Sequence, residues 1–351
     1  MWPIGILTEL QGGFNMNSKD RVVNTLNFRE VDRIPRTLWT LPGISLNRKD
    51  ELEEVLQKYP GDIGCPEYKY GIGKRCAGDP QKIGHYTDEW GCVWQVGEIG
   101  VVGEVKGYPL SEWPMLENYT MPWELLHEAD LSKVERSCNG SDKFMLAGTV
   151  TRPFERMQFL RGTENLLMDL AYGESEVYKL RDMLHEFFMK EMEMWSNTAV
   201  DGVSFMDDWG SQESLLISPA LWRDFFKPLY KDYCDLLHSK GKYVFMHSDG
   251  NIESIYPDLI EIGVDAINSQ LFCMDIEKLG ALYAGKITFW GEIDRQFVLP
   301  FGKKEDVRKA VSRVKNALMK EKRTGVIAQC EWGTKDPKEN IETVFEEWNQ
   351  Y

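Results

Sequence analysis

The sequence lacks an excess of basic residues, since 41 Lys and Arg stand against 56 Asp and Glu and leave a formal net charge of −15. Nucleic-acid affinity depends largely on cations that displace phosphate counterions, so we expect no nucleic-acid partner. The sequence also lacks a charge-free apolar run of about 18 residues, the length that a membrane-spanning helix needs. We therefore expect no membrane-embedded segment.

Cysteine is scarce and scattered: the seven residues, an odd number, form no CxxC pair. This pattern is typical of reduced thiols rather than of a disulfide scaffold, and it predicts a cytoplasmic location. The amino terminus has no basic segment before an apolar one, so it does not resemble a secretion signal. Residues 1–15 precede a second methionine, Met16, and we interpret them as a non-native or disordered leader. Residues 16–351 are predicted to form one domain.

Several motifs that carry familiar chemistry are missing. No GxGxxG follows a candidate strand, and neither GxxxxGK[ST], HExxH nor GxSxG occurs. The glycine-rich motifs cradle phosphates, HExxH holds zinc on one helix face, and GxSxG presents a serine nucleophile. Their absence argues against dinucleotide-binding, nucleotide-binding, zincin and serine-hydrolase functions.

Short apolar runs alternate with longer amphipathic stretches along the chain. Eight runs are predicted to be strands: 34–40, 61–65, 144–149, 202–207, 243–247, 265–269, 287–292 and 325–330. Helices are predicted over 174–198, 218–241 and 304–320, the second with Ser218 as its N-cap. The alternation predicts an α/β fold, a (β/α)8 TIM barrel, in which chemistry sits at the carboxyl ends of the strands.

One segment, 86–107, breaks this alternation. Its two short apolar patterns, around Trp90 and around Gly100, are separated by polar residues. They predict a β-hairpin inserted after the second strand, over the barrel mouth or at a subunit contact.

The fourth predicted strand ends in Asp207 and Asp208, followed by Trp209. Side chains alternate along a strand, so Asp207 shares one side with Val203 and Phe205, and Asp208 points to the other. An inward carboxylate at a barrel mouth is costly to desolvate without a task, which favours a catalytic role for Asp207. Asp208 either caps the next element or binds substrate. Trp209 is predicted to bind substrate.

The fifth predicted strand ends in His247, and Asp249 stands two residues further along. Residues two apart at a strand end share a face, and imidazole and carboxylate are both good ligands for zinc. The alternative is that Asp249 begins an ordinary turn and that His247 is simply hydrogen-bonded. We predict catalytic and metal-binding roles for both residues.

The last predicted strand ends in Cys330 and Glu331. The fifth and eighth strands face each other across a barrel, so this thiol and carboxylate could complete a metal site with His247. A buried cysteine that only packs in the core is the alternative. Gln270 after the sixth strand and Glu292 after the seventh lie on the same rim and are predicted to bind substrate.

These residues resemble, in order and spacing, the uroporphyrinogen decarboxylase superfamily. The resemblance runs from about residue 16 to the carboxyl end and rests on NSKDRV at 17–22, RIP at 33–35, DEWG at 88–91, the Asp207-Asp208 pair, SP at 218–219 before FFKP at 225–228, and His247 with Gly250-Asn251. It implies a (β/α)8 barrel that acts either as a true decarboxylase or as a corrinoid-dependent methyltransferase.

The resemblance favours the methyltransferase branch. True decarboxylases carry two arginines after the first strand, as cationic clamps for a porphyrinogen with many carboxylates, whereas segment 36–43 offers only Arg36. In the methyltransferase branch, a His-x-Cys pair and a later Cys hold zinc. His247 and Cys330 match this pattern, and Asp249 stands where the first cysteine would be.

The resemblance therefore implies a zinc ion held by His247, Asp249 and Cys330, with Glu331 or Gln270 as a fourth ligand. The alternative is a metal-free site, as in relatives that use tetrahydrofolate, in which Asp249 or Asp207 acts as an acid towards a folate nitrogen.

We expect a methyltransferase that moves a methyl group between a corrinoid (cobamide) on a separate protein and a small acceptor such as a thiol or tetrahydrofolate. Methyl transfer is an in-line displacement, so alignment and activation of the acceptor are the main tasks. The alternatives are a decarboxylase of a small aromatic or pyrrolic acid and a barrel that binds a ligand without catalysis. A homodimer is implied by the resemblance.

Overall fold

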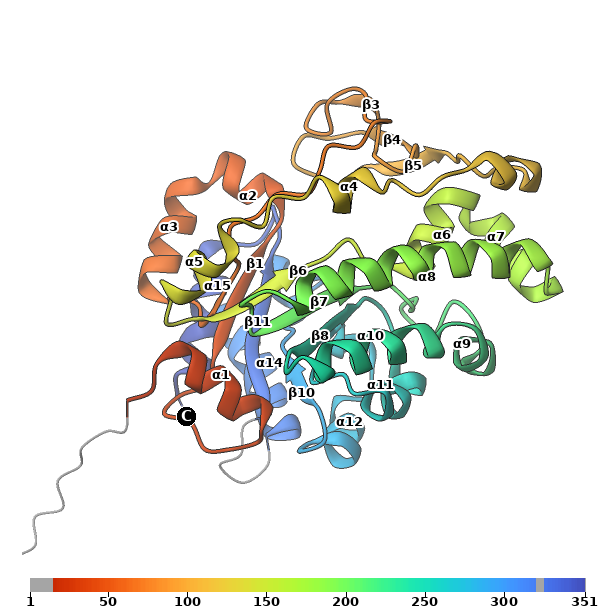
Figure 1. The fold of residues 1–351 in the computed structure, drawn as a ribbon. Helices are drawn as coiled ribbons and strands as arrows, with labels where there is room; N and C mark the ends of the chain where they lie inside the picture. The colour runs from red at the N-terminus through yellow and green to blue at the C-terminus, as the bar shows by residue number, and fades with distance from the viewer. Residues whose placement is uncertain (1–14, 320–324, 351) are drawn as a thin grey trace, which may run out of the picture.

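The computed structural model describes residues 15–319 and 325–350, so the predicted leader lies outside the described residues except for residue 15. Within this part of the chain, eight parallel strands follow the order β1-β11-β10-β9-β8-β7-β6-β2 (Figure 1). The predicted TIM barrel is confirmed. Its strands are β1 (Arg36–Thr40), β2 (Ile63–Gly64), β6 (Phe144–Gly148), β7 (Gly202–Met206), β8 (Tyr243–Ser248), β9 (Ala266–Ser269), β10 (Thr288–Trp290) and β11 (Val326–Trp332).

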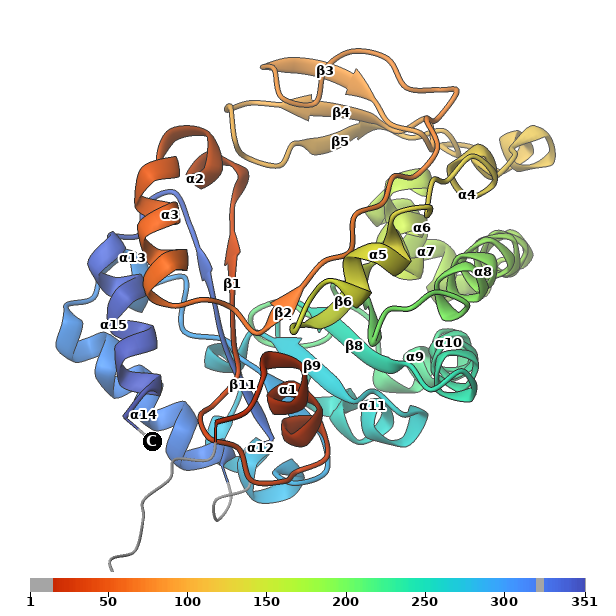
Figure 2. The ribbon, with the colours of Figure 1, turned by 60° about the vertical axis from the view of Figure 1, so that its left-hand side comes forward.

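The ring of strands closes between β1 and β2. The N–H of Asp62, just before β2, donates to the carbonyl of Arg36 at 2.8 Å. Figure 2 shows α1 (Ser18–Leu26) near the amino-terminal ends of these strands. Val22 and Leu26 of α1 pack with Phe245 and other side chains of the barrel interior. The amino-terminal end is therefore plugged, and the carboxyl end is left for chemistry.

Helices cover the outside of the barrel. They are α2 (Pro42–Asn47), α3 (Lys49–Lys58), α4 (Glu124–His127), α5 (Val134–Asn139), α6 (Pro153–Arg161), α7 (Thr163–Tyr172), α8 (Ser175–Ser196), α9 (Pro219–Phe225), α10 (Lys227–Ser239), α11 (Tyr256–Ile262), α12 (Ile276–Tyr283), α13 (Val298–Phe301), α14 (Lys304–Leu318) and α15 (Lys338–Trp348). Short 3-10 turns are η1 (Trp113–Asn118), η2 (Glu253–Ile255) and η3 (Leu271–Cys273). No helix in the described ranges is long and apolar enough to cross a bilayer.

Helices α8 and α14 match two of the predicted helices, although the predicted end of the latter, residue 320, lies outside the described residues. The helix predicted over 218–241 is instead two helices, α9 and α10, which meet at Phe226. Pro228 explains the break, because it has no N–H to donate and is tolerated only in the first turn of a helix. Ser218 caps α9 as predicted, since its hydroxyl accepts a hydrogen bond from the Leu221 N–H at 3.2 Å.

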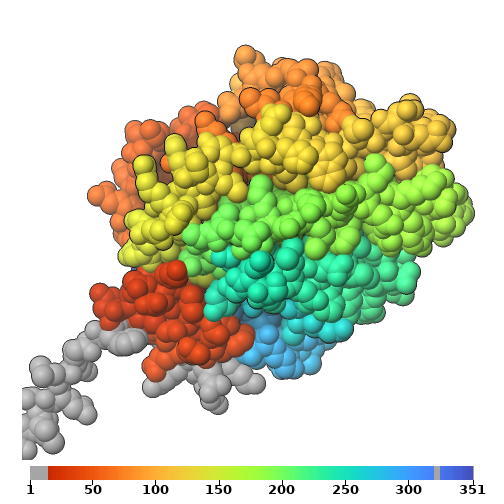
Figure 3. Space-filling model, viewed as in Figure 1, coloured from red at the N-terminus to blue at the C-terminus, as the bar shows by residue number. Residues whose placement is uncertain are grey.

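The segment after β2 forms a three-stranded antiparallel sheet rather than a two-stranded hairpin: β3 (Gly84–Thr87), β4 (Val93–Val96) and β5 (Glu104–Gly107). Asp88 shapes the turn between β3 and β4, because its carboxylate accepts hydrogen bonds from the Trp90 and Cys92 N–H groups. The guanidinium of Arg156 on α6 lies over the Trp90 ring, 4.4 Å from its centroid. The turn between β3 and β4 thus packs on α6. The inserted sheet lies at the end of the barrel where β1 leads into α2 (Figure 2), and in the space-filling view it is the orange region above the yellow and green segments (Figure 3).

A buried ion-pair network ties the start of the chain to the barrel base. The side chain of Asp62 is fully buried, and its carboxylate accepts hydrogen bonds from Arg21 at 2.5 Å and from Arg33 at 2.6 and 2.8 Å. It also accepts the backbone N–H of Arg36 at 2.9 Å. This carboxylate therefore links α1, the segment before β1 and the start of β2.

We expect Asp62→Ala to lower the free energy of unfolding by about 3–5 kcal/mol, because removing one partner of a buried ion pair leaves the other charge uncompensated. Urea unfolding followed by circular dichroism measures this change. Asp79→Ala, which removes a surface ion pair with Lys82, is the matched control and should cost less than about 1 kcal/mol. Equal losses in the two variants would contradict a special role for the base network.

Candidate functional site

Asp207 and Asp208 lie on opposite sides of the chain at the end of β7, but the side that carries Asp207 faces the helices. Phe205, on the same side, stacks on Tyr230 of α10 with ring centroids 5.9 Å apart. The fully buried Asp207 carboxylate accepts the Phe154 and Glu155 N–H groups at the start of α6, at 2.7 and 2.8 Å. The predicted inward orientation of Asp207 is therefore corrected: its carboxylate caps α6.

Trp209 is also in the helix layer rather than at the barrel mouth. Its side chain is fully buried and stacks on Phe154 with ring centroids 4.2 Å apart. Its indole N–H donates to the Tyr230 hydroxyl at 3.2 Å. The structure therefore places Trp209 in the core between α6 and α10, away from any substrate at the mouth.

Asp208 points to the barrel interior, where it lies beside His247 and Asp249 from the end of β8. The Nε2 atom of His247 is 3.6 Å from Asp208 Oδ1 and 3.5 Å from Asp249 Oδ1. One ligand atom from each of the three residues lies within 4.8 Å of the others. The His247 side chain is 10% exposed and the two carboxylates are 39% and 29% exposed, so the group opens towards solvent.

A buried amide network determines which nitrogen of His247 is free. His247 Nδ1 lies 2.7 Å from Asn268 Oδ1. The amide nitrogen of Asn268 is used elsewhere, because it donates to the Trp290 carbonyl at 2.6 Å and to Gln329 Oε1 at 3.1 Å. Asn268 therefore presents its oxygen to His247, which carries its proton on Nδ1. Nε2 is then the nitrogen that faces the two carboxylates, and in the neutral tautomer it is the atom that can bind a metal.

Two features of this group fit a divalent cation. The buried Oδ1 atom of Asp249 has no hydrogen-bond partner. In a tetrahedral zinc site with bonds of about 2.1 Å, neighbouring ligand atoms are about 3.4 Å apart. The separations of 3.5 and 3.6 Å around His247 Nε2 are close to this value. Three such protein groups would leave a fourth position open on an ion, which is the pattern of catalytic rather than structural zinc.

Cys330, predicted as a thiolate ligand, lies on the outer face of β11. Its neighbour Gln329 points into the barrel and bonds Asn268, whereas Cys330 packs in the apolar layer under the helices. Burial raises the pKa of the Cys330 thiol, which disfavours the thiolate. The predicted metal site of Cys330 with His247 and the predicted catalytic role of Asp207 at the barrel mouth are therefore corrected, because Asp207 and Cys330 both face away from His247.

Glu331 and Glu292, predicted as metal ligand and substrate ligand, both pair with Arg295 at the mouth. Arg295 Nη1 lies 3.1 Å from Glu331 Oε1, and Nε lies 3.4 Å from Glu292 Oε1. The Nη2 group donates to Asp249 Oδ2. Glu292 is 4% exposed, and its burial raises its pKa to about 8, although Arg295 acts in the opposite direction. Burial therefore favours the protonated form of Glu292.

A cavity of about 170 Å³ lies next to this cluster. Its lining includes Glu292, Arg295, Gln270 and the apolar ring of Phe297. The side-chain oxygen of Gln270 accepts the Gly250 N–H at 2.9 Å, which ties the cavity wall to the loop after β8. Gln270 and Glu292, which were predicted to bind substrate, thus line one small cavity. It lies beside Arg295, the ion-pair partner of Asp249.

Arg295 and Glu155 were not predicted as site residues. Arg295 stands three residues after Glu292, in the loop that follows a strand. Its position near a strand end was therefore a signal in the sequence that could have identified it as a site residue. Glu155 reaches the site from the first turn of α6, and its pKa is raised by burial and then by the nearby charge of Asp208. No spacing in the sequence connects α6 with β7, so Glu155 required the structure.

Two glycines hold the loops after β7 and β8 together. The N–H of Gly210 donates to the Asp249 carbonyl at 3.1 Å, and the Asp249 N–H donates to Asp208 Oδ1 at 2.8 Å. Gly250 has a φ of +79°, and a Cβ there would lie 2.1 Å from the Gly210 carbonyl oxygen. Glycine is therefore needed for the close approach that brings Asp208 and Asp249 to one histidine.

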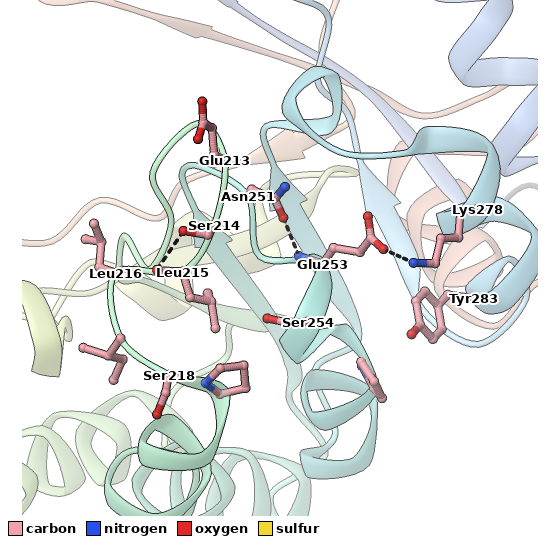
Figure 4. A pocket seen from close by; sticks show the side chains of 13 residues that line it. Glu213, Ser214, Leu215, Leu216, Ser218, Asn251, Glu253, Ser254, Lys278 and Tyr283 are labelled. Atoms are coloured by element: carbon pink, nitrogen blue, oxygen red, sulfur yellow. Dashed lines mark hydrogen bonds and ion pairs between the residues drawn. The ribbon is translucent and has the colours of Figure 1, made fainter.

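A larger surface hollow of about 870 Å³ lies beside the β7–α9 loop, outside this site (Figure 4). Leu215 and Leu216 lie on one side of it, and an ion pair between Glu253 and Lys278 lies on the other. It borders the site through Asn251, and none of the predicted site residues lines it.

Comparisons with known proteins agree with this architecture. The model of the uroporphyrinogen decarboxylase (URO-D) family matches residues 132–351. A methyltransferase from Methanosarcina mazei has a TM-score of 0.71 at 14% sequence identity, over 96% of this chain and 99% of that chain. An endo-β-1,4-xylanase from Gloeophyllum trabeum has a TM-score of 0.43 at 9% identity, over 90% of this chain and 96% of that chain. No curated protein matches the sequence.

We expect Glu292→Gln to change how stability depends on pH. In the folded protein the pKa of Glu292 is about 8, above its usual value of 4.5. The folded state therefore keeps a proton that the unfolded state releases, and wild-type stability falls as pH rises from about 5 to 8, by up to about 1.4 kcal/mol per unit. Glutamine does not titrate and removes this dependence of the free energy of unfolding on pH. The stability of the variant relative to wild type therefore increases towards pH 8.

Urea unfolding at four pH values between 5 and 8 measures this effect. Glu98→Gln, at an exposed position of the insert, is the matched control and should follow the wild-type curve. Parallel curves for wild type and Glu292→Gln would show that Glu292 is ionised in the folded protein.

Proposed function

The chain belongs to the uroporphyrinogen decarboxylase family, and we propose that it is a methyltransferase that moves a methyl group between a corrinoid on a separate protein and a small acceptor such as a thiol or tetrahydrofolate. The observation that carries this proposal is the group of Asp208, His247 and Asp249 at the barrel mouth. An open site of this kind can activate an acceptor for nucleophilic attack. The shared fold with an archaeal methyltransferase supports it.

In this proposal, Asp208, His247 and Asp249 hold a divalent cation, and the imidazole ligand favours zinc. The cation would act as a Lewis acid that lowers the pKa of an acceptor thiol. The protein supplies the geometry: Asn268 engages Nδ1 of His247, so that Nε2 is the nitrogen turned towards the cation, and Gly250 keeps the two carboxylates close. Cys330 is not part of the proposed ligand set.

The cavity beside Arg295 is the proposed binding place of the small substrate. Glu292 can donate a hydrogen bond there as a neutral acid, and Gln212 and Gln270 supply amide groups. Phe297, which is 69% exposed, adds an apolar wall. Because methyl transfer is an in-line displacement, holding the substrate beside the cation is the main contribution of these residues.

Decarboxylation of an aromatic or pyrrolic acid would need a free cation for the substrate carboxylate. Arg295 is the cation in the cavity lining, and its guanidinium already meets Asp249, Glu292 and Glu331. The positive charge of Arg295 is thus already engaged by acids of the protein and is less available to a substrate carboxylate, which favours methyl transfer over decarboxylation.

We expect the purified protein to hold about one zinc ion per chain and to demethylate methylcobalamin in the presence of a thiol, followed by the change in cobalt absorbance. His247→Ala removes a direct ligand and should lower metal affinity by more than about 100-fold, the upper range for loss of an outer-shell partner. Elemental analysis and the absorbance assay measure the two effects.

His85→Ala is the matched control, because His85 is an exposed histidine on the inserted sheet, and it should keep both zinc and activity. Wild-type protein without metal and without corrinoid demethylation would overturn the proposal. Release of carbon dioxide from a pyrrolic acid without any corrinoid would favour the decarboxylase instead.

A further inference from the structure

Arg295 follows β10, and its guanidinium meets carboxylates that follow or end three different strands. Nη2 donates to Asp249 Oδ2, Nη1 lies 3.1 Å from Glu331 Oε1, and Nε lies 3.4 Å from Glu292 Oε1. The Arg295 side chain is only 19% exposed. All three nitrogens of its planar fork therefore face acidic side chains, and two of them donate hydrogen bonds, to Asp249 and Glu331.

This arrangement gives the two oxygens of Asp249 different partners. Oδ2 accepts from Arg295, whereas the buried Oδ1 has no hydrogen-bond partner and lies 3.5 Å from His247 Nε2. The terminal torsion of an aspartate side chain is soft, so an isolated carboxylate turns easily about it. A strong charge-assisted bond on one oxygen therefore decides where the other oxygen points.

We propose that Arg295 is a positioning residue that holds Asp249 Oδ1 towards the cation and keeps Glu331 out of the ligand set. The inference rests on the proposed metal-holding role of this site. Without Arg295, Asp249 could turn away from His247, and Glu331 would become a free carboxylate beside a divalent cation. The arginine thus sets both the orientation of one ligand and the number of carboxylates at the metal.

The backbone around Arg295 is suited to this task. Gly291 has a φ of +61°, and a Cβ there would lie 2.4 Å from the Gln329 Cβ, so the chain turns tightly against β11. The Asp294 carboxylate then accepts the N–H groups of Gln296 and Phe297 at 2.8 and 2.9 Å. The loop that carries Arg295 is therefore held on both sides of this residue. This fixes the backbone position from which the Arg295 side chain extends.

The test is titration of the metal-free full-length protein with Co²⁺, followed by visible absorption, which reports ligand number and geometry. Arg295→Met should weaken Co²⁺ binding by about 10–100-fold, the usual cost of losing an outer-shell partner, and should shift the absorption bands. Arg295→Lys keeps the charge without the planar fork and should show a smaller loss. Glu331→Gln should leave the bands in place, because Glu331 is not a ligand while Arg295 is present.

Arg313→Met is the matched control, because Arg313 on α14 makes two hydrogen bonds of 2.7 Å to one surface carboxylate, that of Glu277 on α12. It should not change Co²⁺ affinity. Thermal unfolding checks that each variant is folded, and if Arg295→Met does not fold, Arg295→Lys carries the test.

The possible failures are distinguishable. A wild-type protein that binds no Co²⁺ overturns the proposed metal site itself. Wild-type binding with unchanged affinity and unchanged bands in the Arg295 variants overturns the positioning role and leaves the metal site standing. Shifted bands in Glu331→Gln would make Glu331 a ligand and likewise overturn the inference.

Discussion

The hydrogen bond between His247 Nδ1 and Asn268 Oδ1 decides what the barrel mouth can bind. It engages a proton on Nδ1 of His247 and turns Nε2 towards Asp208 and Asp249. Asn268 can play this part because its amide nitrogen is committed to the Trp290 carbonyl and to Gln329. The orientation of one histidine at the rim is thus set by neighbouring strands in the barrel wall.

Charge at the mouth is organised around two positive centres. Asp208 and Asp249 face the proposed cation, while Arg295 gathers Asp249, Glu292 and Glu331. Burial raises the pKa of Glu292 and favours its protonated form, which lowers the negative charge that Arg295 has to balance. Asp249 belongs to both groups, so the geometry of the ligands and the electrostatics of the small cavity depend on the same carboxylate.

The fold could be predicted from the sequence because the eight apolar runs and the helices between them are local patterns. The site could be predicted only in part. His247 and Asp249 were found because they share a face at a strand end, and they lie together as expected. The alternation of Asp207 and Asp208 was also correct, but β7 has apolar residues on both sides, as in Phe205 and Met206, so periodicity cannot say which side faces the barrel interior.

The same ambiguity applies to Cys330, which stands one position from the inward Gln329 on a strand whose other residues, except Glu331, are buried. Arg295 and Glu155 lie beyond the strands, on a loop and on a helix, where their approach to the site depends on long-range packing. Proline, by contrast, is a local signal. Pro228 could have indicated from the sequence that the helix predicted over 218–241 is divided into α9 and α10.

The backbone contact between Gly210 and Gly250 makes the loops after β7 and β8 a single unit. Each loop delivers one carboxylate, and neither can accept a side chain at the contact without pushing the other away. A designer who wished to transplant this mouth onto another barrel would therefore have to move both loops together, as a matched pair with a fixed spacing, and could vary freely only the residues beyond the two glycines.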